Sequence, residues 1–227
     1  MKKAFTMIEL VFVIVVIGIL AAVIIPNTRT NSLYEAATQL ISHIRYTQHL
    51  AMVDDKFDST VNSEWYMRRW QLIFGKSDTS TDGKIAYTIF SDNAGSAGHS
   101  NPDMNEMAKD PMNSDKYLSG GYSGTLSTSD SRANKKMNLG VSYSVTTVEM
   151  SGDCNGGCDE FGGNCTGDIR ISFDHLGRPI KGALHGYASA YETNKLLQNQ
   201  CKIILGNQSE NNVTIAIEAE TGYAHIL

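Results

Sequence analysis

The chain has 227 residues, with 19 basic and 24 acidic side chains and 41% hydrophobic residues. This length is enough for one globular domain with a sizeable core and a short additional segment. Two of the basic residues, Lys2 and Lys3, and one acid, Glu9, lie at the N-terminus, which leaves 17 basic and 23 acidic side chains in the remaining chain. This mildly acidic balance excludes a strongly basic domain that binds nucleic acid through its bulk charge.

The segment 5–26 predicts a membrane-spanning helix. Every residue from Leu10 to Ile25 is apolar or Gly, and about 21 residues of helix measure about 30 Å, the thickness of a hydrocarbon core. No small-residue cleavage signal follows the apolar run, so we do not interpret the segment as a discarded secretory signal. Pro26 removes a backbone donor and predicts a kink at the end of the helix.

Glu9 is the one carboxylate in this apolar segment. A charge in a spanning helix costs roughly 2.5–3.5 kcal/mol at the bilayer centre, so it needs a partner or a place near the interface. One interpretation is an acid at headgroup level near the front edge of the helix. The other interpretation is that cleavage after Ala4 frees an amine on Phe5, which pairs with Glu9 of a neighbouring copy.

The N-terminus, KKAFTMIEL followed by the apolar run with Gly18 and Pro26, resembles that of type IV pilins and type II secretion pseudopilins. The resemblance implies that a prepilin peptidase removes the leader 1–4, that Phe5 is then N-methylated, and that Glu9 recognises the terminal amine of an adjacent subunit. Ala4 stands where the family usually has Gly. The implied partners are other pilin or pseudopilin subunits and the inner-membrane assembly platform. The implied location is the bacterial inner membrane, in a single pass with the head in the periplasm.

Residues 27–56 predict an amphipathic helix that continues the first one. Apolar side chains recur there mostly at steps of three, four or seven residues. They are Leu33, Ala36, Ala37, Leu40, Ile41, Ile44, Leu50 and Val53. Asn31 or Ser32 is a candidate cap, and Glu35 has capping-box spacing from Ser32. His43 and His49 lie on this helix, and we interpret both as structural residues rather than metal ligands.

From residue 57 to the C-terminus, period-two patterns rich in β-formers predict six or seven strands of an antiparallel sheet. The strand segments are EWYMRRWQLIFG, KIAYTIFSD, LGVSYSVTTVEM, GDIRISFDHLGRPI, CKIILGN and NNVTIAIEAETGYAHIL. Turn signals at 81–83, 176–179 and 220–222 predict hairpins. Residues 91–136 lack periodicity and predict a polar surface insertion. The predicted fold is therefore α+β, with a long N-terminal helix, membrane-spanning in its first half, packed on an antiparallel β-rich head.

The order of these elements also resembles the H-type (FimT-like) minor pseudopilins. Single residues match at Trp70, Phe173, Gly177 and Gly222, and their plain interpretation is structural, as core aromatics and turn glycines. This resemblance implies a subunit at or near the tip of a filament.

The cysteines predict disulfides, because an even number in an exported head is typical of them. All four follow the apolar segment: Cys154, Cys158, Cys165 and Cys201. Three connectivities exist, and we favour Cys154 with Cys158 and Cys165 with Cys201. A zinc site is a second interpretation, although the spacings are not those of paired C-x-x-C knuckles. The same stretch carries Asp153, Asp159, Glu160 and Asp168 among glycines, which fits either a solvated loop, the interpretation we favour, or a Ca²⁺ site.

The sequence contains no G-x-S-x-G, HExxH or P-loop motif, so we predict no catalytic residue, no cofactor and no resident metal. The candidate nucleic-acid clusters are Arg68-Arg69 among aromatic residues, and Arg132 with Lys135-Lys136. In a strand, Arg68 and Arg69 would point to opposite faces, which favours a structural interpretation.

The predicted function is therefore that of a structural subunit, a minor pilin or pseudopilin. It is processed by prepilin peptidase and assembles into a periplasmic pilus or pseudopilus for type II secretion or type IV pilus function. One alternative is a DNA-uptake pilin whose head binds DNA. Another is an exported enzyme with a pilin anchor, which would need a substrate pocket.

Overall fold

The computed structural model describes residues 6–27, 31–59, 64–93, 101–154, 169–208 and 212–227, with the main chain alone for 21–27 and 193. The chain divides into two compact units between Asn31 and Ser32. The first unit contains helix α1 (Met7–Asn27), and the second contains helix α2 (Ser32–Val53) and all of the strands.

Among the residues that the structure describes, no helix is long and apolar enough to cross a membrane. The predicted membrane-spanning segment and the predicted single-pass inner-membrane location with a periplasmic head are therefore wrong.

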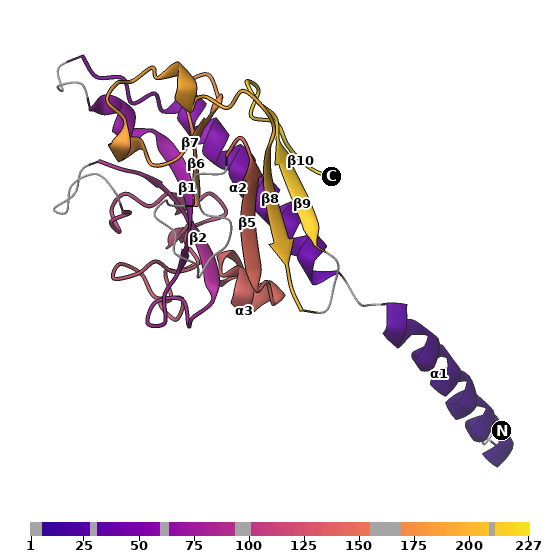
Figure 1. The fold of residues 1–227 in the computed structure, drawn as a ribbon. Coiled ribbons are helices and arrows are strands. Elements are labelled where there is room, and N and C mark those ends of the chain that lie inside the picture. Colours follow the sequence, from indigo (N-terminus) through magenta and orange to yellow (C-terminus); the bar gives the residue numbers. More distant parts are fainter. Residues whose placement is uncertain (1–5, 28–30, 60–63, 94–100, 155–168, 209–211) are drawn as a thin grey trace. The chain divides into compact units, whose positions relative to one another are not determined.

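Eight of the strands form two four-stranded antiparallel sheets (Figure 1). The first sheet has the order β2 (Ile85–Ser91), β1 (Trp70–Lys76), β6 (Arg170–Phe173), β7 (Pro179–Lys181). The second has the order β10 (Ala224–Ile226), β9 (Val213–Ile217), β8 (Cys201–Gly206), β5 (Thr147–Gly152). A small hairpin joins β3 (Lys109–Asp110) to β4 (Asn113–Tyr117).

Short helices complete the second unit. They are η1 (Trp65–Arg68), η2 (Lys135–Met137), α3 (Leu139–Tyr143), η3 (Leu184–Gly186) and η4 (Thr193–Lys195). Two of them replace predicted strand: η1 takes the front of EWYMRRWQLIFG, and α3 takes the front of LGVSYSVTTVEM.

Helix α2 packs against both sheets (Figure 1). Its buried residues recur at steps of three and four, as the amphipathic pattern predicts. They are Leu33, Ala36, Ala37, Leu40, Ile41, Ile44, Thr47 and Ala51. The pattern differs from the prediction only in the last turns, where Leu50 is half-buried and Val53 is exposed.

The predicted fold class needs correction as a whole. The prediction was one long N-terminal helix, membrane-spanning in its first half and packed on a head. The structure instead has two separate helices, and α1 belongs to a unit of its own. The second unit is a β-rich antiparallel fold in which α2 covers parts of both sheets.

Gln48 on α2 ties two hairpin turns to the helix. Its Nε2 donates to the carbonyl oxygens of Gly177 (2.8 Å) and Thr221 (2.7 Å). The first carbonyl belongs to the β6–β7 turn and the second to the β9–β10 turn. Gly222 requires glycine here, because its φ is +66° and a Cβ would lie 2.5 Å from the Gly177 carbonyl oxygen.

Replacing Gln48 with Ala should lower the free energy of unfolding by about 1–2 kcal/mol, because two backbone carbonyls lose their donor. The measurement is urea denaturation of the whole chain. Thr38→Ala on the same helix is the control, because Thr38 is exposed and its hydroxyl donates to the Tyr34 carbonyl of its own helix. An equal loss in both variants would contradict this role of Gln48.

The segment predicted as a polar surface insertion, 91–136, is built into the fold where it is described. The Leu118 carbonyl accepts from Ile89 N, and the Ser119 hydroxyl bonds that of Thr88 at 2.7 Å. Leu118 and Ala133 are buried. Residues 101–136 therefore extend the edge of the first sheet at β2, while residues 94–100 lie outside the described part.

His43 on α2 faces the fully buried Tyr87 of β2. Gln39 Nε2 donates to Tyr87 Oη at 2.9 Å, which directs the hydroxyl proton toward His43 Nδ1 at 2.7 Å. An imidazole that accepts this bond must be neutral. Burial also lowers the pKa of His43 from 6.5 to about 4, although the charge of Asp110 acts in the opposite direction.

This burial predicts a pH dependence of stability. Because the folded pKa of His43 lies below 6.5, the unfolded chain binds more protons between pH 6.5 and 4, and stability falls as the pH falls through this window. We expect His43 to remove about 2–3 kcal/mol between pH 7 and pH 4. Urea denaturation at several pH values should show a correspondingly flatter profile for His43→Gln. His49→Gln, an exposed position on the same helix, should keep the original slope.

One disulfide joins Cys154 to Cys201. The favoured pairing of Cys154 with Cys158 and of Cys165 with Cys201 is therefore wrong. Strands β5 and β8 pair with Gly152 opposite Cys201, which places Cys154, two residues later, beside the first residue of β8. Cys158 and Cys165 lie outside the described residues. Because both described sulfurs are in a disulfide, they are not the thiolates that a zinc site needs.

The bridge closes a loop with a sequence separation of 47, for which the chain-entropy model gives about 4 kcal/mol. Cys154→Ser combined with Cys201→Ser should therefore lower the free energy of unfolding by about 2–4 kcal/mol. Guanidinium denaturation without reductant measures the effect. Adding reductant should destabilise the parent chain by breaking this bridge, whereas the double variant has no bridge between these two positions to lose. An unchanged parent would contradict the bridge's role.

Candidate functional site

Glu9 and Thr6 cap the start of α1. Thr6 N and Thr6 Oγ1 each donate to Glu9 Oε2 at 2.9 Å, and Glu9 N donates back to Thr6 Oγ1 at 3.4 Å. This reciprocal arrangement is a capping box, with Thr6 before the first helical residue and Glu9 at the third. The two hydrogen bonds from Thr6 lower the pKa of Glu9, so the carboxylate is charged at neutral pH.

Behind this cap, α1 presents apolar side chains on every side. Apart from Glu9 and Gly18, each described residue from Met7 to Leu20 is apolar, and all of them are exposed. Phe12 is 70% exposed and Ile17 is 60% exposed. A contiguous apolar surface of this kind marks an interaction site.

The other predicted N-terminal site residues are only partly described. Ala4 and Phe5, at the predicted cleavage and methylation point, lie outside the described residues. Pro26 lies in the last turn of α1, which ends at Asn27. The kink at Pro26 and the processing before Phe5 stay predictions.

The structure engages one arginine of each candidate nucleic-acid cluster in contacts within the protein. Residues 65–68 are the short helix η1 rather than strand, and Arg69 is buried, with its guanidinium 5.0 Å from the Trp65 ring centre. Arg132 is exposed but donates from Nε and Nη2 to both carboxylate oxygens of Asp130. Neither arginine is a free surface cation for phosphate.

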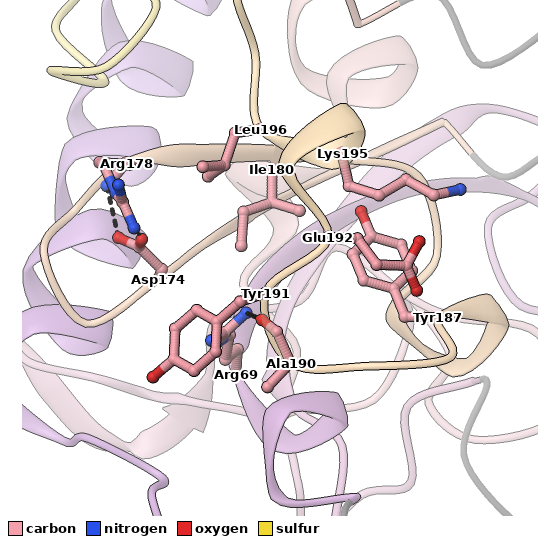
Figure 2. Close-up of a pocket in the computed structure, with 10 residues that line it drawn as sticks. All are labelled: Arg69, Asp174, Arg178, Ile180, Tyr187, Ala190, Tyr191, Glu192, Lys195 and Leu196. Carbon is pink, nitrogen blue, oxygen red and sulfur yellow. Dashed lines mark hydrogen bonds and ion pairs between the residues drawn. The ribbon is translucent and has the colours of Figure 1, made fainter.

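Arg69 instead lines a cavity of about 240 Å³, which we call the Arg69 pocket (Figure 2). Its walls come from Arg69, the residue after η1, from the turn between β6 and β7, from β7, and from the long connection between β7 and β8. Ile180, Tyr187, Ala190, Tyr191 and Leu196 form the apolar part of the lining. Tyr66 holds the connection in place, because its buried hydroxyl donates to the Tyr187 carbonyl at 2.8 Å.

Both acids of the Arg69 pocket accept hydrogen bonds, whereas Lys195 contacts an aromatic ring. Asp174 accepts from Arg178 Nε at 2.7 Å, drawn as a dashed line in Figure 2, and from the backbone of Arg178 and Leu176. Glu192 accepts from the backbone nitrogen of Ser189 at 3.1 Å. Lys195 lies over the Tyr187 ring, 5.0 Å from its centre. Burial lowers the pKa of Arg69, while the charge of Asp174 acts in the opposite direction.

Asp153, a residue of the possible Ca²⁺ loop, is already engaged. Its Oδ1 accepts from Lys181 Nζ at 3.1 Å, and its Oδ2 accepts from the backbone nitrogens of Gln198 and Asn199. The other acids of that stretch, Asp159, Glu160 and Asp168, lie outside the described residues. Within the described residues, no group of three or more His, Cys, Asp or Glu side chains could hold a metal ion.

Comparison of the chain with family models, with curated proteins and with solved structures finds no match. The functional argument therefore rests on the residues of the chain and their geometry.

Sequence reasoning missed two features of these sites. The Thr6-x-x-Glu9 spacing is a capping-box signal that the sequence does carry, so the cap could have been predicted. The Arg69 pocket could not, because Arg69 and Tyr191 are more than 100 positions apart and their contact depends on the packing of η1 under the β7–β8 connection.

Proposed function

We propose that this protein is a structural subunit of a pilus-type filament, of the minor pilin or pseudopilin kind, and that it assembles through α1. The observation that carries the proposal is one capped carboxylate, Glu9, at the front of a helix whose described side chains are otherwise apolar and exposed.

The apolar surface of α1 supports assembly between copies. A helix that is hydrophobic all round is buried in its working state. The same helix of neighbouring subunits would provide an apolar cover of matching length and composition. Packing α1 helices together would remove side chains such as Phe12 and Ile14 from water, at about 25 cal/mol per Å² of apolar area.

Glu9 gives this assembly its register. A carboxylate enclosed by apolar helices is strongly unfavourable unless an opposite charge pairs with it. Thr6 supplies hydrogen bonds but no charge. Cleavage after Ala4 by a prepilin peptidase would create an amine on Phe5, and this amine in a neighbouring copy would be the missing counter-charge. We propose that processing, N-methylation of Phe5 and docking with other pilin subunits on an assembly platform occur in this order.

The decisive variant is Glu9→Gln, because Gln keeps the capping hydrogen bond and loses the charge. If Glu9 pairs with an amine, incorporation of the Glu9→Gln variant into filaments should fall about tenfold or more, because a buried charge pair that loses one partner costs about 3–5 kcal/mol. The measurement is the fraction of the subunit recovered in sheared filaments, relative to its total amount in the cell.

Thr6→Ala is the matched control. It weakens the cap by removing Thr6 Oγ1 but keeps the Glu9 charge, so its incorporation should stay within about twofold of the parent. Intact mass of each variant must show a chain that begins at Phe5, so that a failure of processing is not mistaken for a failure of assembly. Normal incorporation of Glu9→Gln together with loss in Thr6→Ala would assign Glu9 to capping alone and refute the pairing.

A further inference from the structure

Arg69 has two buried donors that no described residue satisfies. The side chain is 5% exposed, and its Nε and Nη2 have no hydrogen-bond partner among the described residues. Only Nη1 is used, in a bond of 3.1 Å to the Ala190 carbonyl. Buried donors are almost always paired in folded proteins, so two on one guanidinium call for an explanation.

The two unsatisfied nitrogens are the ones that a carboxylate would use. Nε–H and Nη2–H lie on the same edge of the planar guanidinium and point in parallel, which matches the two oxygens of a carboxylate. The bond from Nη1 to Ala190 fixes the plane of the group and leaves this edge free of a described partner. Arg69 is therefore oriented before any ligand arrives.

The acids that line the pocket make no hydrogen bond to Arg69. Asp174 is paired with Arg178 and acts on Arg69 only through its charge, and Glu192 is bonded to the backbone of its own loop (Figure 2). Since Arg178 is offset by Asp174, the remaining formal charges are those of Arg69 and Lys195 against Glu192. The residues that line the cavity therefore carry a net formal charge of +1, which favours an anion.

The walls define the rest of the ligand. Tyr187, Tyr191, Ile180 and Leu196 surround the cavity with aromatic and aliphatic surface. Its volume of about 240 Å³ lies below the range of drug-sized sites and is suited to one amino-acid-sized group. Aromatic walls favour an aromatic ring, which packs edge-on or offset against them.

We infer that the Arg69 pocket binds a carboxylate attached to an aryl-sized apolar group, with both oxygens on the Nε–Nη2 edge of Arg69 and the apolar group against Tyr187 and Leu196. The source is either a free small acid or the C-terminal carboxylate of a polypeptide, since both present the same chemistry. This inference does not depend on assembly through α1.

Tyr191 is the side chain that admits the ligand. Its ring centre lies 5.6 Å from the Arg69 guanidinium, while the residue itself is 63% exposed. An exposed ring can rotate away at low cost, whereas Trp65 beneath the guanidinium is buried. A carboxylate would thus exchange the cation–π contact with Tyr191 for a bidentate, charge-assisted pair, which is the stronger interaction.

The test compares N-acetyl-phenylalanine with its neutral amide, N-acetyl-phenylalaninamide, on the full chain by isothermal titration calorimetry. The acid should bind with millimolar affinity or better, and at least about tenfold more tightly than the amide. In the unmodified chain, the Nε–H proton resonance of Arg69 should shift downfield with the acid and not with the amide. This measurement keeps the inference testable even if a variant fails to fold.

Two variants assign the preference to Arg69. Arg69→Lys keeps the charge but removes the two-donor edge, and Arg69→Met removes both, so each should abolish the preference for the acid. Arg132→Lys is the matched control and should keep it, because Arg132 is exposed and already satisfied by Asp130.

Two further probes identify the source. 3-Phenylpropanoate represents a free acid, and N-acetyl-Gly-Gly-Phe represents a polypeptide C-terminus. Tighter binding of the tripeptide supports a protein partner, and equal or tighter binding of the small acid supports a free ligand. Equal binding of N-acetyl-phenylalanine and its amide, binding of neither, or a preference that survives in Arg69→Met would overturn the inference.

Discussion

The buried face of α2 is the constraint on which the second unit depends. The two four-stranded sheets share no strand pair in the described residues, so their backbone hydrogen bonds do not fix one sheet relative to the other. The helix does so by packing against β1 and β6 of one sheet and β8, β9 and β10 of the other. Small residues such as Ala36 and Ala37 on this face let the strands approach closely, while Leu40 and Ile44 fill the space between them.

The same constraint shapes the Arg69 pocket. Gln48 holds the Gly177 carbonyl, and Gly177 lies in the turn that also carries Asp174 and Arg178. This wall of the cavity is therefore attached to the core through α2. The opposite wall comes from the β7–β8 connection, where Tyr191 is exposed. The pocket thus has one side fixed by the core and one side that faces solvent.

Local patterns predicted the elements whose structure depends on local sequence. The three- and four-residue steps of α2 and the β-formers of β2, β8 and β9 are read from neighbouring residues. Asp82 and Gly83, with φ of 55° and 65°, confirm the turn predicted from Thr81-Asp82-Gly83. These local signals fail where contacts with distant segments determine the conformation. The aromatic residues of η1 predict a strand by their sequence pattern. In the structure, Trp65 and Tyr66 instead pack with Leu184 and Tyr187, far along the chain.

The predictions of the disulfide pairing and of the polar surface insertion missed the structure for the same reason. Cys154 meets Cys201 only because β5 and β8 pair, and no spacing rule contains that pairing. In residues 101–136, low hydrophobicity suggested a surface insertion, yet polar side chains are what secure it. Thr128 Oγ1, for example, accepts from Asn138 Nδ2, which also donates to the Thr81 carbonyl inside the fold. Composition reports how polar a segment is, and does not report whether its polar groups find partners.

The cap on α1 has a consequence for how one carboxylate can serve two subunits. Both donors of Thr6 bind the same oxygen of Glu9, Oε2, and no described residue occupies Oε1. The helix therefore needs only half of the carboxylate. In the proposed assembly, a cation of the neighbouring subunit could bind the other oxygen without unwinding the first turn. The carboxylate could therefore cap its own helix and contact the neighbouring subunit at the same time. If the protein assembles as proposed, the start of its helix would already be folded before docking, and the entropy of forming that turn would not be lost at that moment.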